Sequence, residues 1–211
     1  HDGGDSLLRA FTKIIEDLNL EDSLFARYGG DEFIIAKYNY ESTNEIIALL
    51  EKIIKKLSKP LMIKEKELFC TISIGVSLYP KDGTDIKEVI KRADMAMYLA
   101  KKNGKNRYQI FDIKMLQVLD REFEIEKGLR TAIENNEIKI MYQPKILVAT
   151  SKVIGFEALV RWESKELGFV SPKEFISIAE SSGLIISIGK YIIEEVFKNC
   201  REILLETDKE F

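Results

Sequence analysis

The stretch Arg27-Tyr28-Gly29-Gly30-Asp31-Glu32-Phe33 joins two short strand-like runs, residues 24–28 and 33–36. Adjacent glycines between β-forming residues predict a tight hairpin, because only glycine adopts a positive φ at both turn positions at low cost. The two carboxylates that follow suit a hard metal ion such as Mg²⁺, and the glycines admit a polyphosphate. For Gly29-Gly30-Asp31-Glu32 alone, a solvated acidic turn is the more frequent structure. The surrounding sequence must therefore decide between such a turn and a nucleotide site.

Around this hairpin the sequence predicts the order α-β-β-α-β-α, with helices packed on an antiparallel sheet. Apolar residues recur at helical spacing over residues 5–19, and Ser42 with Glu45 forms a capping box that begins a second helix. Apolar residues alternate over residues 70–78, as in a half-buried strand. Asp85 then caps a third helix. The expected fold class is therefore α/β, with a first domain of the α+β type.

A long charged helical stretch, residues 113–135, is interpreted as a connector into a second domain. Beyond it, residues 138–142 alternate and residues 153–162 form a further strand-like run. Ser171-Pro172-Lys173-Glu174 is a capping box with proline at the first helical position, and a last helix follows over residues 184–205.

The composition excludes several classes of site. The only histidine is His1, so histidine-based zinc sites and Ser-His-Asp triads are ruled out, and chemistry must run on carboxylates, lysines, backbone groups and a hard metal. Cys70 and Cys200 stand alone in apolar runs and predict buried thiols in a reducing cytoplasm. A net charge of −3 without a basic cluster argues against nucleic acid as a partner.

The ends of the chain also shape the expectation. No apolar run approaches the roughly 18 residues of a membrane span, so a membrane anchor is expected only in segments outside this stretch. The chain begins with His1 rather than Met and inside a helical pattern, so we expect a fragment of a longer protein.

The motif Arg27–Phe33 resembles the signature that names the GGDEF family of diguanylate cyclases. Several further segments resemble the same family in order: residues 1–8, 71–76, 91–101 and 103–108. The resemblance covers residues 1–112, as a GGDEF domain that is truncated at its N-terminus. Several ordered matches are far more specific than any one of them alone.

This resemblance implies that two GTP molecules condense into cyclic di-GMP, each 3′-hydroxyl attacking the α-phosphorus of the other GTP as pyrophosphate leaves. By position, Asp31 and Glu32 are implied to hold Mg²⁺ or Mn²⁺ and to help activate the hydroxyl. Gly29 and Gly30 are implied to pass beneath the phosphates.

Three further residues receive substrate-binding roles from the same resemblance. Asp5 is implied to accept hydrogen bonds from the guanine edge, and Lys101 and Lys105 to neutralise the terminal phosphates. Without the family resemblance, the residues alone favour a helix N-cap for Asp5 and a helix C-terminus for both lysines. The family often has arginine where Lys105 stands, and lysine keeps the charge without the bidentate fork.

Two features of the family are expected but not found in this sequence. The first strand of the family, which carries another metal-binding Asp and a base-contacting Asn, would precede His1. The Arg-x-x-Asp product-inhibition motif would fall at Leu20 and Ser23. We therefore expect no feedback by the product at that site.

The motif Glu157-Ala158-Leu159-Val160-Arg161-Trp162 resembles the start of an EAL phosphodiesterase domain, and residues 142–145, 168–172 and 183–189 extend the match. The resemblance implies metal-assisted hydrolysis of cyclic di-GMP, with Glu157 as a metal ligand and with Gln143 and Arg161 binding the substrate. Ser164-Lys165 replaces the usual His-Pro.

The implied EAL fold is a TIM-like barrel. Such barrels need about 250 residues, so residues 122–211 are expected to supply only its first part and to be incomplete as a hydrolase.

Three hypotheses follow. The protein is an enzyme that makes or breaks cyclic di-GMP, a receptor that binds GTP or cyclic di-GMP without turnover, or a dimerisation module. The expected partners are GTP and cyclic di-GMP, with a homodimer formed through either domain. We rank the dimerisation module last, because a bare scaffold does not need Asp31, Glu32, Lys101 and Glu157 together.

Overall fold

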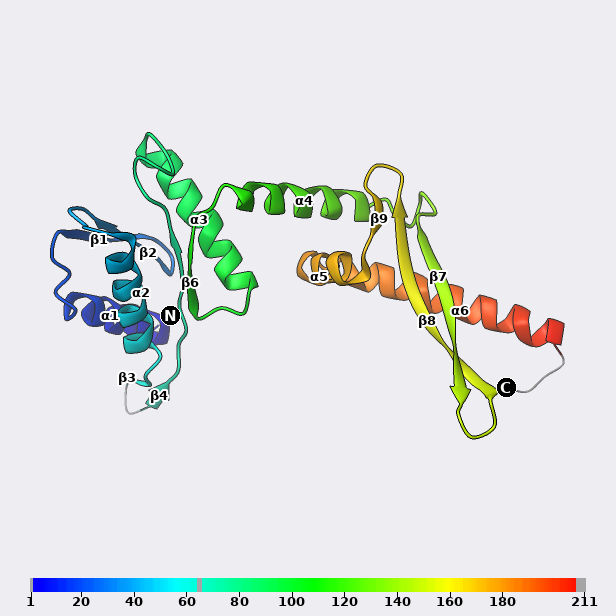
Figure 1. Ribbon diagram of the computed structural model, residues 1–211. Coiled ribbons are helices and arrows are strands. Elements are labelled where there is room, and N and C mark those ends of the chain that lie inside the picture. The colour runs from blue at the N-terminus through cyan, green and yellow to red at the C-terminus, as the bar shows by residue number, and fades with distance from the viewer. Residues whose placement is uncertain (1, 64–65, 208–211) are drawn as a thin grey trace. The chain divides into compact units, whose positions relative to one another are not determined.

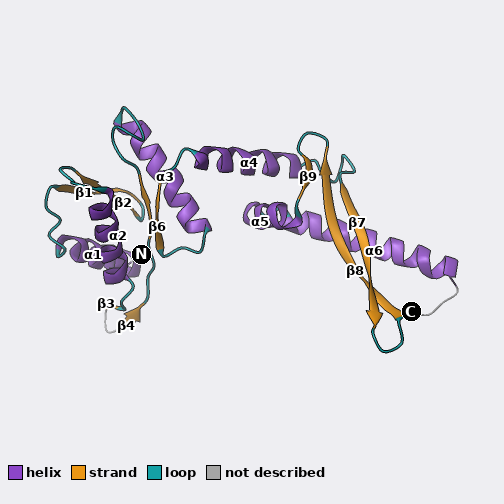
Figure 2. Cartoon of the chain, viewed as in Figure 1, coloured by secondary structure: helices purple, strands orange, loops and turns teal. Residues whose placement is uncertain are grey.

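A computed structural model describes residues 2–63 and 66–207 of the chain. The chain divides into two compact units, His1–Met115 and Leu116–Phe211, and each unit is described by itself. Both units combine helices with strands, which confirms the mixed α/β fold class (Figure 2).

The first unit contains three helices and six strands within the described residues (Figure 1). The helices are α1 (Asp2–Glu16), α2 (Thr43–Leu57) and α3 (Ile86–Lys102). The strands are β1 (Ser23–Gly29), β2 (Glu32–Lys37), β3 (Leu61–Ile63), β4 (Lys66–Leu68), β5 (Ser73–Val76) and β6 (Arg107–Ile110). The β1–β2 and β3–β4 pairs are antiparallel.

The β1–β2 hairpin is held on α1 and α2 by apolar packing. Ile15, Ile53 and Leu57 form a buried cluster between the two helices and the hairpin. Phe33 of β2 lies 4.6 Å, ring centre to ring centre, from Phe11 of α1, and it stacks on Phe25. These rings fix the inner face of the hairpin and leave its turn in solvent.

The pair β5–β6 is parallel, which differs from the antiparallel sheet expected for this domain. A parallel pair needs a crossover connection, and α3 supplies it between the two strands. The helix lies so close to β5 that a Cβ added at Gly75 would lie 1.8 Å from the carbonyl oxygen of Ala93.

The second unit is built on one antiparallel sheet with the strand order β7-β8-β9. Its elements are α4 (Lys114–Leu129), β7 (Ile138–Leu147), β8 (Lys152–Ser164), β9 (Gly168–Val170), α5 (Pro172–Ser182) and α6 (Ile185–Thr207). Helix α4 begins in the last residues of the first unit and ends at Leu129, earlier than the predicted helical stretch. Three strands cannot close a barrel, so the TIM-like barrel remains a prediction.

Trp162 is the centre of the second core. Its side chain is completely buried, packs edge-on against Phe175, and donates a hydrogen bond from Nε1 to Glu137 Oε2 at 3.1 Å. Gly128 of α4 lies against the same ring, where an added Cβ would approach it to 3.0 Å.

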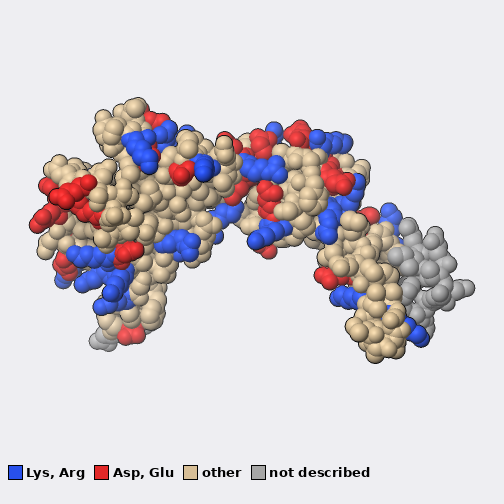
Figure 3. Space-filling view, in the orientation of Figure 1, with Lys and Arg blue, Asp and Glu red and all other residues tan. Residues whose placement is uncertain are grey.

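Two surface properties bear on partners. Within residues 2–63 and 66–207, the structure contains no helix with the length and apolar character of a membrane span. On the face seen in Figure 3, the first unit gathers acidic side chains at its left end and basic side chains below them, whereas both signs are mixed on the second unit.

The prediction of two buried thiols is wrong for Cys200, which is exposed on α6, whereas Cys70 is half-buried and burial raises its thiol pKa.

Candidate functional site

The turn of the β1–β2 hairpin consists of Gly30 and Asp31. Gly29 pairs with Glu32, and the register shifts between Arg27 and Gly29. Gly30 has a φ of 51°, which favours glycine, whereas Gly29 lies outside the left-handed region. The expectation that both glycines need a positive φ is therefore wrong for Gly29.

Nothing in the described structure requires glycine at position 29. A Cβ built there would meet no atom within 4 Å, and the backbone conformation is open to other residues. Because the fold does not require glycine here, the lack of a side chain leaves room for a ligand to approach the backbone closely. Gly29 is therefore compatible with the prediction that a polyphosphate lies against its backbone.

The carboxylates of Asp31 and Glu32 are exposed at this turn. Among the described residues, no three acidic, histidine or cysteine side chains gather into a metal cage. Mg²⁺ is commonly held by only one or two carboxylates, with water and substrate phosphates completing its octahedral shell. Adjacent exposed carboxylates therefore fit a metal that arrives with a nucleotide.

A surface groove of about 510 Å³ lies between α1 and the hairpin. Asp5 lines it, together with Arg27 and Phe33 from the hairpin. Asp5 lies inside α1 rather than at its N-cap, because the helix already begins at Asp2; the N-cap alternative is wrong. The sequence interpretation missed the other residues of this groove, which come from α1 and the turn that follows it: Leu8, Arg9, Thr12, Lys13 and Glu16 of the helix, and Asp17.

Arg27 is a second feature that sequence reasoning missed. Its guanidinium donates hydrogen bonds from Nε and Nη2 to the carbonyl oxygen of Gly30, at 3.0 and 2.7 Å. The motif signalled the hairpin, but no sequence pattern signalled that this side chain spans its turn.

The two candidate phosphate-binding lysines lie at the end of α3 and do not line the groove. Lys101 is exposed in the last helical turn. Lys105 follows the helix with a φ of 56° and donates its backbone N–H to the carbonyl of Ala100 at 3.1 Å. Their position suits a helix C-terminus, and the phosphate role stays a prediction.

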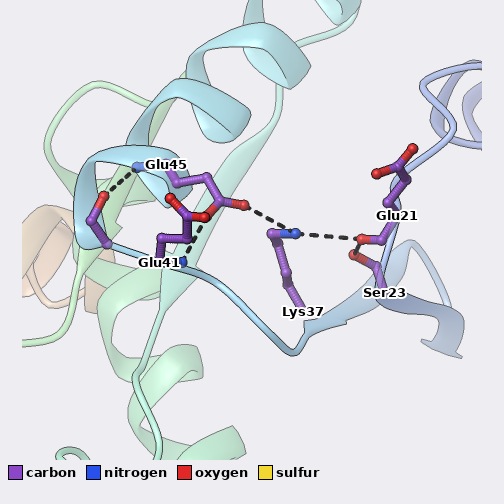
Figure 4. A network of polar contacts seen from close by, with 6 residues as sticks. Glu21, Ser23, Lys37, Glu41 and Glu45 are labelled. Carbon is purple, nitrogen blue, oxygen red and sulfur yellow. Dashed lines mark hydrogen bonds and ion pairs between the residues drawn. The ribbon is translucent and has the colours of Figure 1, made fainter.

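A polar network lies where the product-inhibition motif was expected (Figure 4). Ser23 donates its hydroxyl to the carbonyl of Glu21, and Lys37 Nζ lies 3.4 Å from that same oxygen. Lys37 also pairs with Glu45 at 3.1 Å. The backbone N–H of Glu41 and then Lys37 hold the pKa of Glu45 below its usual value. These groups satisfy one another, and the lack of product feedback stays a prediction.

The three candidate residues of the second unit share one face of the β7–β8 pair. Gln143 lies directly opposite Glu157, and Arg161 lies four residues further along β8, opposite Lys139. Since side chains alternate along a strand, this face is opposite the one that buries Trp162. Gln143 and Glu157 are exposed, and Arg161 is half-buried with Nη1 donating to the carbonyl of Val160.

Comparison with known families matches two models. "Diguanylate cyclase, GGDEF domain" matches residues 1–107, and "EAL domain" matches residues 126–210. Among solved structures, the GGDEF domain of TpbB (YfiN) from Pseudomonas aeruginosa is 26% identical, with a TM-score of 0.55 over 57% of this chain and 70% of that one.

Two curated relatives match nearly the whole chain. Signaling protein YkoW of Bacillus subtilis is 41% identical over 95% of this chain. Bifunctional diguanylate cyclase/cyclic di-GMP phosphodiesterase MucR of Pseudomonas aeruginosa is 36% identical over 99%. The chain spans only 25% and 30% of the lengths of these relatives. On the fold, the hairpin turn and these matches, the chain belongs to the GGDEF diguanylate cyclase domain family and continues into an EAL domain, as in cyclic-di-GMP signalling proteins.

Proposed function

We propose that this chain is part of a protein that turns over cyclic di-GMP, in which the first unit belongs to the domain that makes it from two GTP and the second to the domain that hydrolyses it to pGpG. The observation that carries the proposal is the hairpin turn, where Gly29 leaves open space beside two exposed carboxylates. The name of MucR, which joins both activities, supports the same reading.

In the first unit each group has a distinct task. Both families generally depend on divalent metal ions. Asp31 and Glu32 would hold Mg²⁺ or Mn²⁺, which when bound offsets the negative charge of the phosphates. Gly29 and Gly30 would let the triphosphate lie against the backbone. Asp5, in the adjacent groove, would accept hydrogen bonds from a guanine edge.

Lys101 and Lys105 would neutralise the terminal phosphates of the same nucleotide. Because the reaction joins two GTP molecules, two copies of the first unit facing each other would supply one nucleotide each. A two-fold homodimer brings identical surfaces together in this way.

In the second unit, Glu157 would contribute one ligand to a metal bound with cyclic di-GMP. Gln143 lies beside it across the strands, within reach of the same phosphodiester. Arg161, on the same face, would pair with a phosphate through its planar guanidinium.

The test uses the full-length gene product and chromatography of its products. Incubation with Mg²⁺ and GTP should yield cyclic di-GMP, and Glu32→Gln should abolish it. Incubation with cyclic di-GMP should yield pGpG, and Glu157→Gln should abolish that. A protein that binds these nucleotides but converts neither is a receptor, and the enzymatic proposal is then wrong.

A further inference from the structure

The side chain of Arg27 contacts a single backbone atom of the hairpin turn. Both hydrogen bonds from its guanidinium go to the carbonyl oxygen of Gly30 in the turn, and no ion pair of Arg27 is found among the described residues. The residue is exposed. Exposed hydrogen bonds add little to stability, because water replaces them on unfolding. The contact is therefore better explained by the conformation that it selects.

Holding one carbonyl fixes the whole peptide plane. The bond between Gly30 and Asp31 is trans, so its C=O and N–H point in opposite directions. With the carbonyl held toward Arg27, the N–H of Asp31 points away from Arg27. Glycine turns rotate this peptide at low cost, and the rotated form would present a carbonyl oxygen in place of the N–H.

The orientation matters for an anionic ligand. A backbone N–H attracts a phosphate oxygen, whereas a carbonyl oxygen at the same place repels it. The same peptide carries Asp31, so its rotation would also move that carboxylate. Arg27 further lines the groove that contains Asp5, and so links the turn to that groove.

We propose that Arg27 is a positioning residue of the nucleotide site: by holding the Gly30 carbonyl, it keeps the Asp31 N–H directed toward the incoming phosphates. This inference rests on the proposed function of the first unit. It assigns Arg27 a role through the backbone rather than a direct contact with the reacting atoms.

The test compares Arg27→Ala and Arg27→Lys with the wild type, all in the full-length protein. Kinetics with GTP and Mg²⁺ give kcat and KM, and calorimetric titration with GTP and Ca²⁺ gives Kd without turnover. We expect Arg27→Ala to lower kcat/KM by about 10- to 100-fold at an unchanged melting temperature. Arg27→Lys, which can still donate one hydrogen bond to the carbonyl, should recover part of the loss. Arg107→Ala, which removes an exposed arginine from another strand of the first unit, serves as the matched control.

The outcomes separate this inference from the proposed function. If the wild type neither binds nor converts GTP, both are wrong. If it binds GTP without forming product, the synthesis proposal fails, and Arg27 is judged by Kd alone. If Arg27→Ala matches the wild type in both measurements, or if its loss equals that of Arg107→Ala, the positioning role is refuted. A loss that only follows a lower melting temperature refutes it as well.

Discussion

The two glycines of the hairpin should respond in opposite ways to the same substitution. Gly30 has a φ of 51°, and an alanine in the left-handed region costs roughly 1–2 kcal/mol. Gly29 has no such conformation and open space around a Cβ, so alanine there should be neutral or stabilise by about 0.4–1 kcal/mol through the unfolded chain.

In a domain of this size, 1 kcal/mol shifts the melting temperature by roughly 4 °C or more. Thermal denaturation followed by circular dichroism should therefore show a clear fall for Gly30→Ala and none for Gly29→Ala. Titration of the full-length protein with GTP should instead show the larger effect for Gly29→Ala. Gly29→Ala should weaken GTP binding at least about tenfold, equivalent to 1.4 kcal/mol, because the added methyl group occupies the space in which we propose that the phosphates lie.

If Gly29→Ala melts as low as Gly30→Ala, position 29 is constrained by the fold and its glycine says nothing about a ligand. If Gly29→Ala is stable and binds GTP as tightly as the wild type, no phosphate lies against that residue.

Three further predictions concern the scaffold. Gly75→Ala should destabilise the first unit by about 3 kcal/mol or more, measured by urea denaturation, because its Cβ would meet a carbonyl oxygen of α3 at 1.8 Å; a loss below 1 kcal/mol would contradict the close packing. Trp162→Phe should cost the second unit about 2–4 kcal/mol, since it leaves a gap and removes a donor from the buried Glu137; a Phe123→Leu variant at an exposed site should not. The pKa of Glu45 is lowered in the folded protein, so its contribution to stability is present above its ordinary pKa of 4.5 and is lost as the pH falls through the lower pKa of the folded state. The difference in melting temperature between the wild type and Glu45→Gln should therefore shrink in acid. A difference that stays constant with pH would be inconsistent with this.

Local signals in the sequence predicted local structure well. Ser42, Asp85 and Ser171 were each expected to begin a helix, and each accepts a hydrogen bond from the backbone N–H three residues later. These caps depend on neighbours within one turn, which the sequence shows directly. The hairpin at Gly29 and Gly30 was predicted for the same reason, although only one of the glycines needs its special conformation.

Contacts between distant segments were harder to predict from the sequence. The parallel pairing of β5 with β6 depends on how α3 returns the chain, and alternation of apolar residues does not specify the direction of a partner strand. The groove beside Asp5 arises where one face of α1 meets the hairpin, and the interpretation of α1 used only its apolar face. Motifs identified Asp31, Glu32 and Glu157 as candidates, but their spacing could not show that Gln143 lies directly opposite Glu157.

We expect the β1–β2 turn to bind a nucleotide through its carboxylates. Calorimetric titration of GTP into the full-length protein, with Ca²⁺ in place of Mg²⁺ to prevent turnover, compares the wild type with Asp31→Asn/Glu32→Gln. We predict saturable binding by the wild type and an affinity at least about tenfold weaker, or 1.4 kcal/mol, in the double variant at an unchanged melting temperature. Equal affinity in the two proteins would contradict it.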